Sequence, residues 1–173
     1  IVNSNLGGTK TDRALQRSTN LKSQVASDGT VTNTLTYTVK NPLPSSPGLA
    51  NKSFVRVYVP RGSNLISTDG FNKDIQLPRL ETEGYTLDEQ VEEWQKDLSQ
   101  DVNTGTYTGT EAGKTWFGNW LEVPGGETKT VTINYTLPYK LGNIDRQSLL
   151  LQKQPGSQTG PINYELSFGG RSS

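Results

Sequence analysis

The sequence contains no histidine, no cysteine and no methionine. Without histidine, the chain lacks the commonest general base and the commonest ligand of transition metals. Without cysteine, it has no thiolate nucleophile, no thiolate zinc site and no disulfide. We therefore expect no enzymatic activity, no catalytic residue, and no metal or cofactor site within these 173 residues.

Net charge and long apolar runs are absent as well. Seventeen basic residues balance seventeen acidic ones, so no global field attracts nucleic acid or an anionic membrane. No run approaches the roughly 18 apolar residues of a membrane-spanning helix, and no signal peptide is recognisable. We expect no contact with nucleic acid or membrane within this chain, and any anchor to lie outside it. The first residue is not Met, which favours a fragment or a processed product.

Alternation of apolar and polar residues is the strongest positive signal. Residues 31–39 (VTNTLTYTV) place Val, Leu, Tyr and Val on one face, with only Asn33 polar among them, and four threonines on the other, and residues 130–137 repeat the pattern. Side chains of a strand alternate between the two faces of a sheet, so each segment predicts a strand with one buried and one solvated face. Residues 54–59 (FVRVYV) carry apolar side chains on both faces, which predicts a central strand covered on both sides.

Turn signals separate further expected strands. These strands are predicted at 14–26, 64–67, 114–123, 149–151 and 162–168. Seven to eight strands indicate an all-β fold, an immunoglobulin-like or fibronectin-like β-sandwich, in a single domain over residues 1–173. No Cys-Trp-Cys pattern is present, which argues against an antibody-type domain.

An inserted segment is expected between the sandwich strands, over about residues 69–113. Within it, Thr86 and Glu89 have the spacing of a capping box, which predicts a short helix over about 86–98. The apolar stripe of this helix consists of Leu87, Val91, Trp94 and Leu98. We expect the insertion to pack on the sandwich through Trp94, and residues 101–113 to form a flexible polar loop.

A series of strand and turn motifs resembles a known family. The motifs are K-T-D from Lys10, Y-T-V-K-N-P from Tyr37, F-V-R-V-Y-V-P-R-G-S from Phe54, G-K-T-W-F-G-N-W-L-E-V-P-G-G-E-T-K-T-V from Gly113, Y-T-L-P from Tyr135 and L-Q-K-Q-P-G from Leu151. Together they resemble the C-terminal β domain of an uncharacterised bacterial cell-surface family, a domain of unknown function that follows a membrane-anchored N-terminal part. The resemblance covers most of the chain from about Lys10 to Phe168, except the helical insertion, and implies shared fold rather than shared activity. It brings no catalytic residues.

Three aromatic residues are the best candidates for ligand binding. Trp116 and Trp120 share a strand face opposite Phe117 and Leu121, and exposed aromatic rings of this kind, with Tyr107, can stack on sugars. If the insertion covers that face, the rings belong to a core and the site vanishes. We favour the covered arrangement.

Other candidate sites are weaker. An acidic group on the expected helix consists of Asp88, Glu89, Glu92, Glu93 and Asp97, which we interpret as a solvated face rather than a calcium site. A second cation candidate in the next loop consists of Asp101, Asn103, Thr104 and Glu111. Residues for a Lys–Asn amide bond are present without a recognised motif, and they are Lys40, Asn41, Asn134 and Glu122. Ser63 lies in an R-G-S turn without a nucleophile motif, so we expect it to end the preceding strand.

Two functional classes follow from these expectations. The first is a non-enzymatic extracytoplasmic β-sandwich that serves as a spacer, assembly or protein-interaction module of a larger surface protein. Its partners would be other domains of that protein or other cell-surface proteins. The second is a glycan-binding module that uses the face of Trp116 and Trp120. Burial discriminates between them, because two or more exposed, coplanar rings would favour the glycan.

Overall fold

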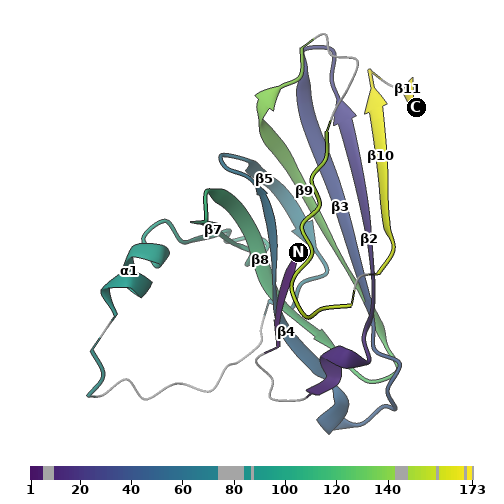
Figure 1. Cartoon of the computed structure of the whole chain (residues 1–173), viewed down its shortest axis with the longest axis vertical. Helices are drawn as coiled ribbons and strands as arrows, with labels where there is room; N and C mark the ends of the chain where they lie inside the picture. Colours follow the sequence, from purple (N-terminus) through teal and green to yellow (C-terminus); the bar gives the residue numbers. More distant parts are fainter. Residues whose placement is uncertain are drawn as a thin grey trace.

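The structure, a computed structural model, describes residues 1–5, 10–73, 84–86, 88–142, 148–158, 160–169 and 171–172. The fold is mostly β, and its strands form two sheets that lie against each other (Figure 1). Sheet A has five strands in the order β1-β4-β8-β7-β6, and sheet B has six in the order β11-β10-β2-β3-β9-β5. The strands are β1 (Val2–Asn5), β2 (Gln16–Val25), β3 (Thr30–Lys40), β4 (Asn51–Pro60), β5 (Asn64–Asp69), β6 (Ser99–Gln100), β7 (Tyr107–Glu111), β8 (Lys114–Val123), β9 (Thr128–Lys140), β10 (Ile162–Phe168) and β11 (Arg171–Ser172). Two short 3₁₀ helices, η1 (Lys10–Arg13) and η2 (Pro47–Leu49), precede β2 and β4.

The two alternating segments form the centre of sheet B, as predicted. β3 and β9 pair antiparallel, with Leu35 opposite Ile133 and Tyr37 opposite Val131, and all four side chains are buried. Their threonines lie on the other face, where hydroxyl groups bond across strands, as in the 3.1 Å contact between Thr38 and its partner on β9. The period of two residues therefore sets both the core face and the polar outer face of this sheet.

Sheet A supplies the opposite half of the core. Val55 and Val57 of β4 and Phe117 and Leu121 of β8 point toward sheet B and are at most 2% exposed. They form one apolar cluster with the inward residues of β2, β3 and β9. The prediction of two packed sheets around such a core is confirmed.

The last long strand pairs in an unexpected way. β10 is a strand, as its alternation predicted, but it runs parallel to β2, whereas the other strand pairs are antiparallel among the described residues. Beyond β10 only the two-residue β11 follows, and Ile162, Tyr164 and Phe168 are about two-fifths exposed. An edge position therefore leaves apolar side chains in solvent that the pattern alone assigned to the core.

The expected strand at residues 149–151 is wrong. Leu149, Leu150 and Leu151 are exposed and belong to no strand, and the chain crosses here from β9 toward β10 (Figure 1). Three consecutive leucines have no alternation, so they lack the one-sided pattern that fixes a strand on a core.

A strand occupies part of the segment expected to be a flexible loop. β7 pairs with β8 through a two-residue turn at Ala112 and Gly113, both with positive φ, of 49° and 71°. Such turns match the right-handed twist of a hairpin, but alanine is uncommon at positive φ, so the Ala-Gly pair carries little signal for this turn. Because β6 and β7 are strands of sheet A, the segment 69–113 is only partly an insertion. The described strands number eleven instead of seven to eight, mainly because short edge strands carry little pattern.

The helix is shorter than expected and begins later. α1 spans Glu89–Gln95, and its N-cap is Asp88, whose carboxylate accepts bonds from the backbone N–H groups of Gln90 and Val91. The Thr86 capping box is therefore wrong, because the aspartate two residues later satisfies the free N–H groups itself.

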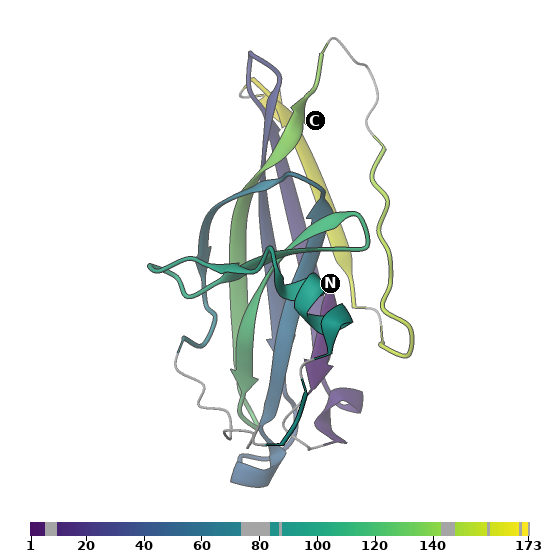
Figure 2. The same ribbon diagram turned by 90° about the vertical axis from the view of Figure 1, so that its left-hand side faces the viewer.

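α1 lies on the outer side of sheet A in both views (Figures 1 and 2). Val91 is 40% exposed, and Leu98, beyond the helix, is 42% exposed, so neither is buried in a core. Leu87 and the side chain of Trp94, which the prediction used for docking, lie outside the described part of the structure.

Candidate functional site

The three predicted aromatic residues share the outer face of sheet A. On β8, Trp116 and Trp120 point away from sheet B, and on β7 Tyr107 has the same orientation because it pairs with Gly118. Phe54 of β4 lies opposite Trp120 and joins them. The strand register thus brings together the residues that the sequence proposed, and adds Phe54 and its neighbours on β4, which sequence analysis did not assign to the site.

Trp116 is not available to a ligand in this arrangement. Its side chain is 8% exposed, and it lies over Gly109 so closely that a Cβ there would come within 2.7 Å of the indole ring. From the other side, the guanidinium carbon of Arg56 lies 5.0 Å from the ring centroid, a cation–π contact. Glycine below and arginine above therefore enclose this ring.

The other rings are half-buried and tilted against one another. Phe54 and Trp120 are 5.4 Å apart at their centroids with an interplanar angle of 76°, and Phe54 meets Tyr107 at 6.1 Å and 54°. Edge-to-face packing of this kind stabilises an aromatic cluster. A flat platform would need rings in one plane, and the described rings do not form one.

Charged groups beside the rings are paired. Glu111 accepts a 2.6 Å hydrogen bond from the hydroxyl of Tyr58 and lies 3.3 Å from a terminal nitrogen of Arg56. Burial, and then the hydrogen bond to Glu111, raise the pKa of Tyr58. Lys52 and Glu122 form a second pair, at 3.3 Å. The face therefore has aromatic rings at its centre and two ion pairs beside them.

The acidic residues of the helix do not converge. Asp88 caps α1, Glu93 pairs with Lys96, and Asp97 accepts a 3.0 Å bond from Thr110 of β7. The residues of this acidic group are exposed, so each carboxylate has a local structural role or faces solvent.

The second cation candidate is divided between two places. The Asp101 carboxylate accepts hydrogen bonds from the Thr104 hydroxyl, at 2.7 Å, and from the backbone N–H groups of Thr104, at 2.7 Å, and Asn103, at 3.2 Å. These bonds lower its pKa, the hydroxyl of Thr104 most. Glu111 lies at the far end of β7 with Arg56. Among the residues that the structure describes, no three acidic side chains gather as a metal site would require.

The two asparagines considered for a Lys–Asn amide bond are engaged elsewhere. Asn41 is fully buried and its amide nitrogen donates to the carbonyls of Leu49 and Val123. Asn134 bonds to hydroxyl groups on the outer face of sheet B. Both amides are held by other partners, so they are not placed for the bond. Ser63 donates to the Pro60 carbonyl at 2.8 Å and ends β4, as expected.

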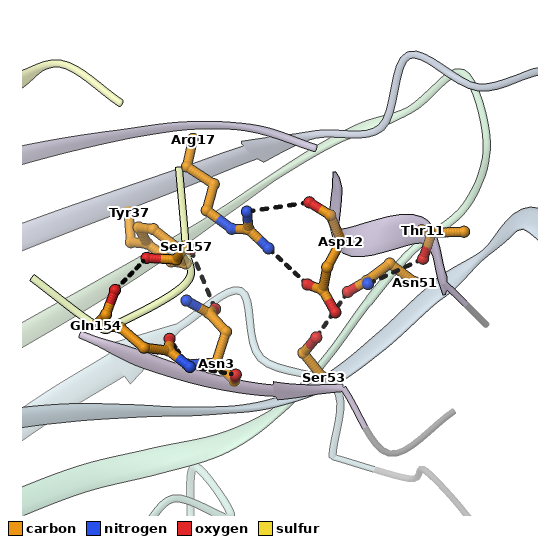
Figure 3. Close-up of polar contacts among 9 residues, drawn as sticks. All are labelled: Asn3, Thr11, Asp12, Arg17, Tyr37, Asn51, Ser53, Gln154 and Ser157. Carbon is orange, nitrogen blue, oxygen red and sulfur yellow. Dashed lines mark hydrogen bonds and ion pairs between the residues drawn. The ribbon is translucent and has the colours of Figure 1, made fainter. Parts of the chain in front are cut away.

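A polar cluster near the edge strand β1 connects the two sheets and was missed in the sequence (Figure 3). The Arg17 guanidinium, 10% exposed, binds Asp12 at 2.6 Å, and the Tyr37 hydroxyl donates to the Asn3 side chain at 3.1 Å. The side-chain amide of Gln154 accepts from the Asn3 backbone N–H and donates to its carbonyl, at 2.9 and 3.1 Å. These bonds join β1 to β3 and to the crossing segment, and they join β2 to η1. The only signal in the sequence was an arginine in phase with the inward residues of β2.

No helix in the described part of the chain is long and apolar enough to cross a membrane. Comparison of the chain with protein-family models, curated proteins and solved structures finds no match.

Proposed function

We propose that this chain is a non-enzymatic module of a larger bacterial cell-surface protein, located outside the cytoplasm, where it acts as a spacer, assembly or protein-interaction domain. The observation that most supports this proposal is the packing of Trp116, which Arg56 and Gly109 enclose. Glu111 and Glu122, on the same sheet face, are likewise held in ion pairs within the domain, as expected of a scaffold.

Two further features support the proposal. The motifs from Lys10 to Phe168 resemble the extracytoplasmic β domain of an uncharacterised bacterial surface family, in which a membrane-anchored part precedes the β domain. The two packed and mainly antiparallel sheets are compatible with an immunoglobulin-like or fibronectin-like sandwich, which is the finer fold type that we propose. The partners in this proposal are neighbouring domains of the same protein or other cell-surface proteins.

An activity screen tests the non-enzymatic role. The domain is assayed against esters, glycosides and phosphates, beside the variants Glu111→Ala and Glu122→Ala. We expect the same background rate for all three proteins, because both glutamates form ion pairs rather than an acid–base pair. Turnover that one of these substitutions abolishes would make the protein an enzyme and overturn the proposal.

A glycan-binding module is the second candidate. It is favoured by one observation, the half-buried state of Trp120 and Tyr107 on one sheet face. Binding to insoluble polysaccharides, compared between the native protein and Trp120→Ala, tests it. If a polysaccharide retains the native protein but not Trp120→Ala, the result favours glycan binding over the scaffold role. If the two proteins bind equally, the result excludes a glycan site at Trp120.

A further inference from the structure

β2 and β10 form the only parallel pair among the described strands. The register pairs Ile162 with Thr19 at one end and Phe168 with Val25 at the other, seven residue pairs in all. The start of β2 lies beside η1 at one end of the sandwich, and the end of β10 lies at the opposite end (Figure 1). The two strands therefore run side by side along most of sheet B, with the start of one and the end of the other far apart.

This arrangement decides how the pair responds to tension. When the start of β2 and the end of β10 are pulled apart, the strands slide along each other, and all seven residue pairs carry the load together. When two neighbouring ends of a strand pair are pulled apart, the residue pairs separate one at a time, and each carries the whole load in turn. The parallel direction therefore favours resistance to a force that acts along the sheet.

Backbone hydrogen bonds continue the ladder beyond both ends of β10. Before β10, the Thr19 N–H donates to the Pro161 carbonyl at 3.0 Å. After it, the Gly169 N–H donates to the Val25 carbonyl at 2.9 Å. The ladder on β2 is therefore closed at both ends by regular bonds rather than frayed.

The chain before β10 fits closely against β2. Gly160 lies so near Arg17 that a Cβ at Gly160 would overlap the Arg17 carbonyl oxygen, and only glycine permits this approach. On the outer face, Lys22 and Glu165 form an ion pair at 3.1 Å, with both side chains about half-exposed. An exposed ion pair adds little to stability. The position of β10 on β2 therefore depends mainly on the backbone ladder and on the close approach at Gly160.

Burial does not explain why β10 is held in this way. Among the described residues, the apolar core cluster contains no side chain of β10, and Ile162, Tyr164 and Phe168 are about two-fifths exposed. Parallel strands are usually covered on both faces, so an exposed parallel strand at a sheet edge is unusual. The ladder between β10 and β2, rather than the side chains of β10, is the main contact of this strand.

We propose that the β2–β10 pair is a tension-bearing clamp, which lets the domain transmit a pulling force between the parts of a surface protein joined to its two ends without unfolding. β1, which precedes the clamp, is held by only four residue pairs with β4. It detaches first, and the load then reaches the start of β2. This inference rests on the proposed role as a spacer, and it gives that role a mechanical property.

Single-molecule force spectroscopy on the full chain tests the clamp. The sequence contains no cysteine, so two introduced thiols define the points of attachment. In the first protein, cysteines are added before Ile1 and after Ser173, and tension loads β2 and β10 at opposite ends. In the control protein, Ser27→Cys, in the exposed turn after β2, replaces the first cysteine, and tension loads neighbouring ends of the same two strands. Unfolding under force reports the barrier to rupture rather than equilibrium stability, so the two geometries can differ although the native structure is the same.

We expect the force that separates β10 from β2 to be severalfold higher when the chain ends are pulled than in the control. The same residue pairs share the load in the first geometry and break one at a time in the second. In the control, β10 should detach at low force, as a separate step in the extension trace before the rest of the domain unfolds. Equal forces in the two geometries, a higher force in the control, or early low-force detachment of β10 when the chain ends are pulled would overturn the proposal.

Substitutions at one position of β10 distinguish the backbone ladder from the side chains. The Pro161 carbonyl and the Gly169 N–H face β2, and alternate residues of a strand direct their backbone groups to the same side, so the Glu165 N–H faces β2 as well. Glu165→Pro removes this N–H and the carboxylate, whereas the matched control Glu165→Ala removes the carboxylate alone. We expect the proline variant to lower the rupture force severalfold and the alanine variant to keep it. Equal losses in the two variants would assign the load to the ion pair and overturn the clamp.

Circular dichroism shows whether each variant is folded, and the comparison of loading geometries needs no substitution within the ladder. These outcomes are separate from the proposed function. A low rupture force overturns the clamp and leaves a non-enzymatic module in place, whereas turnover in the activity screen contradicts that function whatever the rupture force.

Discussion

The outer faces of the two sheets differ, although their inner faces meet in one core. On sheet B the outer face carries threonines and amides, such as Thr34 and Asn134, which bond to each other at 2.7 Å. On sheet A the outer face carries an aromatic cluster that includes Phe54, Trp116 and Trp120. One sheet therefore has a single apolar face and the other has two.

This difference was already present in the strand patterns. Residues 31–39 alternate with Asn33 as the one exception, whereas residues 54–59 carry apolar side chains on both faces. The second pattern marks the sheet that forms a second apolar layer. Phe54, which also lies under Arg56, and Trp120 remain half-buried, whereas Trp116 is buried. A sheet face that binds a ligand and a sheet face that packs as a second apolar layer have the same sequence pattern. The burial of each ring distinguishes the two.

The largest effect is expected at the inner face of β8. Phe117→Ala removes a side chain that is fully buried between the sheets, so we expect the free energy of unfolding to fall by about 3–5 kcal/mol. Urea denaturation followed by circular dichroism measures it. A loss below about 1 kcal/mol would contradict the placement of this ring in the core.

A smaller loss is expected one residue earlier, on the outer face. Trp116→Ala should lower the unfolding free energy by about 2–3 kcal/mol, because Arg56 can move into part of the space and solvent is near. The matched control is Thr132→Ala, on the outer face of sheet B, which should change stability by no more than about 0.5 kcal/mol. Equal losses of unfolding free energy in the two variants would contradict the conclusion that the two outer faces differ in packing.

A pH dependence distinguishes the buried tyrosine of sheet B. Burial raises the pKa of Tyr135 to about 12, above the usual value near 10. The folded state therefore holds this proton more tightly, and its contribution is fully present below pH 10 and is lost as pH rises through 12. We expect about 2 kcal/mol of stability to disappear over that window.

The control for this effect is Tyr135→Phe, which has no ionisable hydroxyl. Its unfolding free energy, measured by urea denaturation between pH 9 and about 11.5, should fall less steeply than that of the native protein. Parallel curves for the two proteins would show that Tyr37 and Tyr58, whose pKa values are also raised, or lysines cause the decline.

The sequence predicted the central strands better than the edges. Strict alternation at 31–39 and 130–137 led to the right faces because a one-residue shift would expose every core side chain. Edge strands such as β1 and β6 are too short to show a period. The position of β1 also depends on β4, which lies far away in the chain. The parallel pairing of β10 with β2 depends on tertiary contacts. The local pattern of residues 162–168 does not indicate the direction of this pairing.

Prediction of the candidate site was limited in a similar way. Spacing alone placed Trp116 and Trp120 on one face, since residues four apart in a strand share a side. Their burial depends on Arg56 and Gly109, which come from two other strands.

The smallest effect concerns the start of α1, where the sequence suggested the wrong cap. Asp88→Ala removes the carboxylate that accepts bonds from two backbone N–H groups, and we expect local helix stability to fall by about 1 kcal/mol. Amide hydrogen exchange at Glu92, whose N–H bonds to the Asp88 carbonyl, should become about fivefold faster. Thr86→Ala is the matched control, because Thr86 precedes the helix and caps nothing in it. Faster exchange in Thr86→Ala, with no change in Asp88→Ala, would restore the capping box and move the helix start back to the position that the sequence indicated.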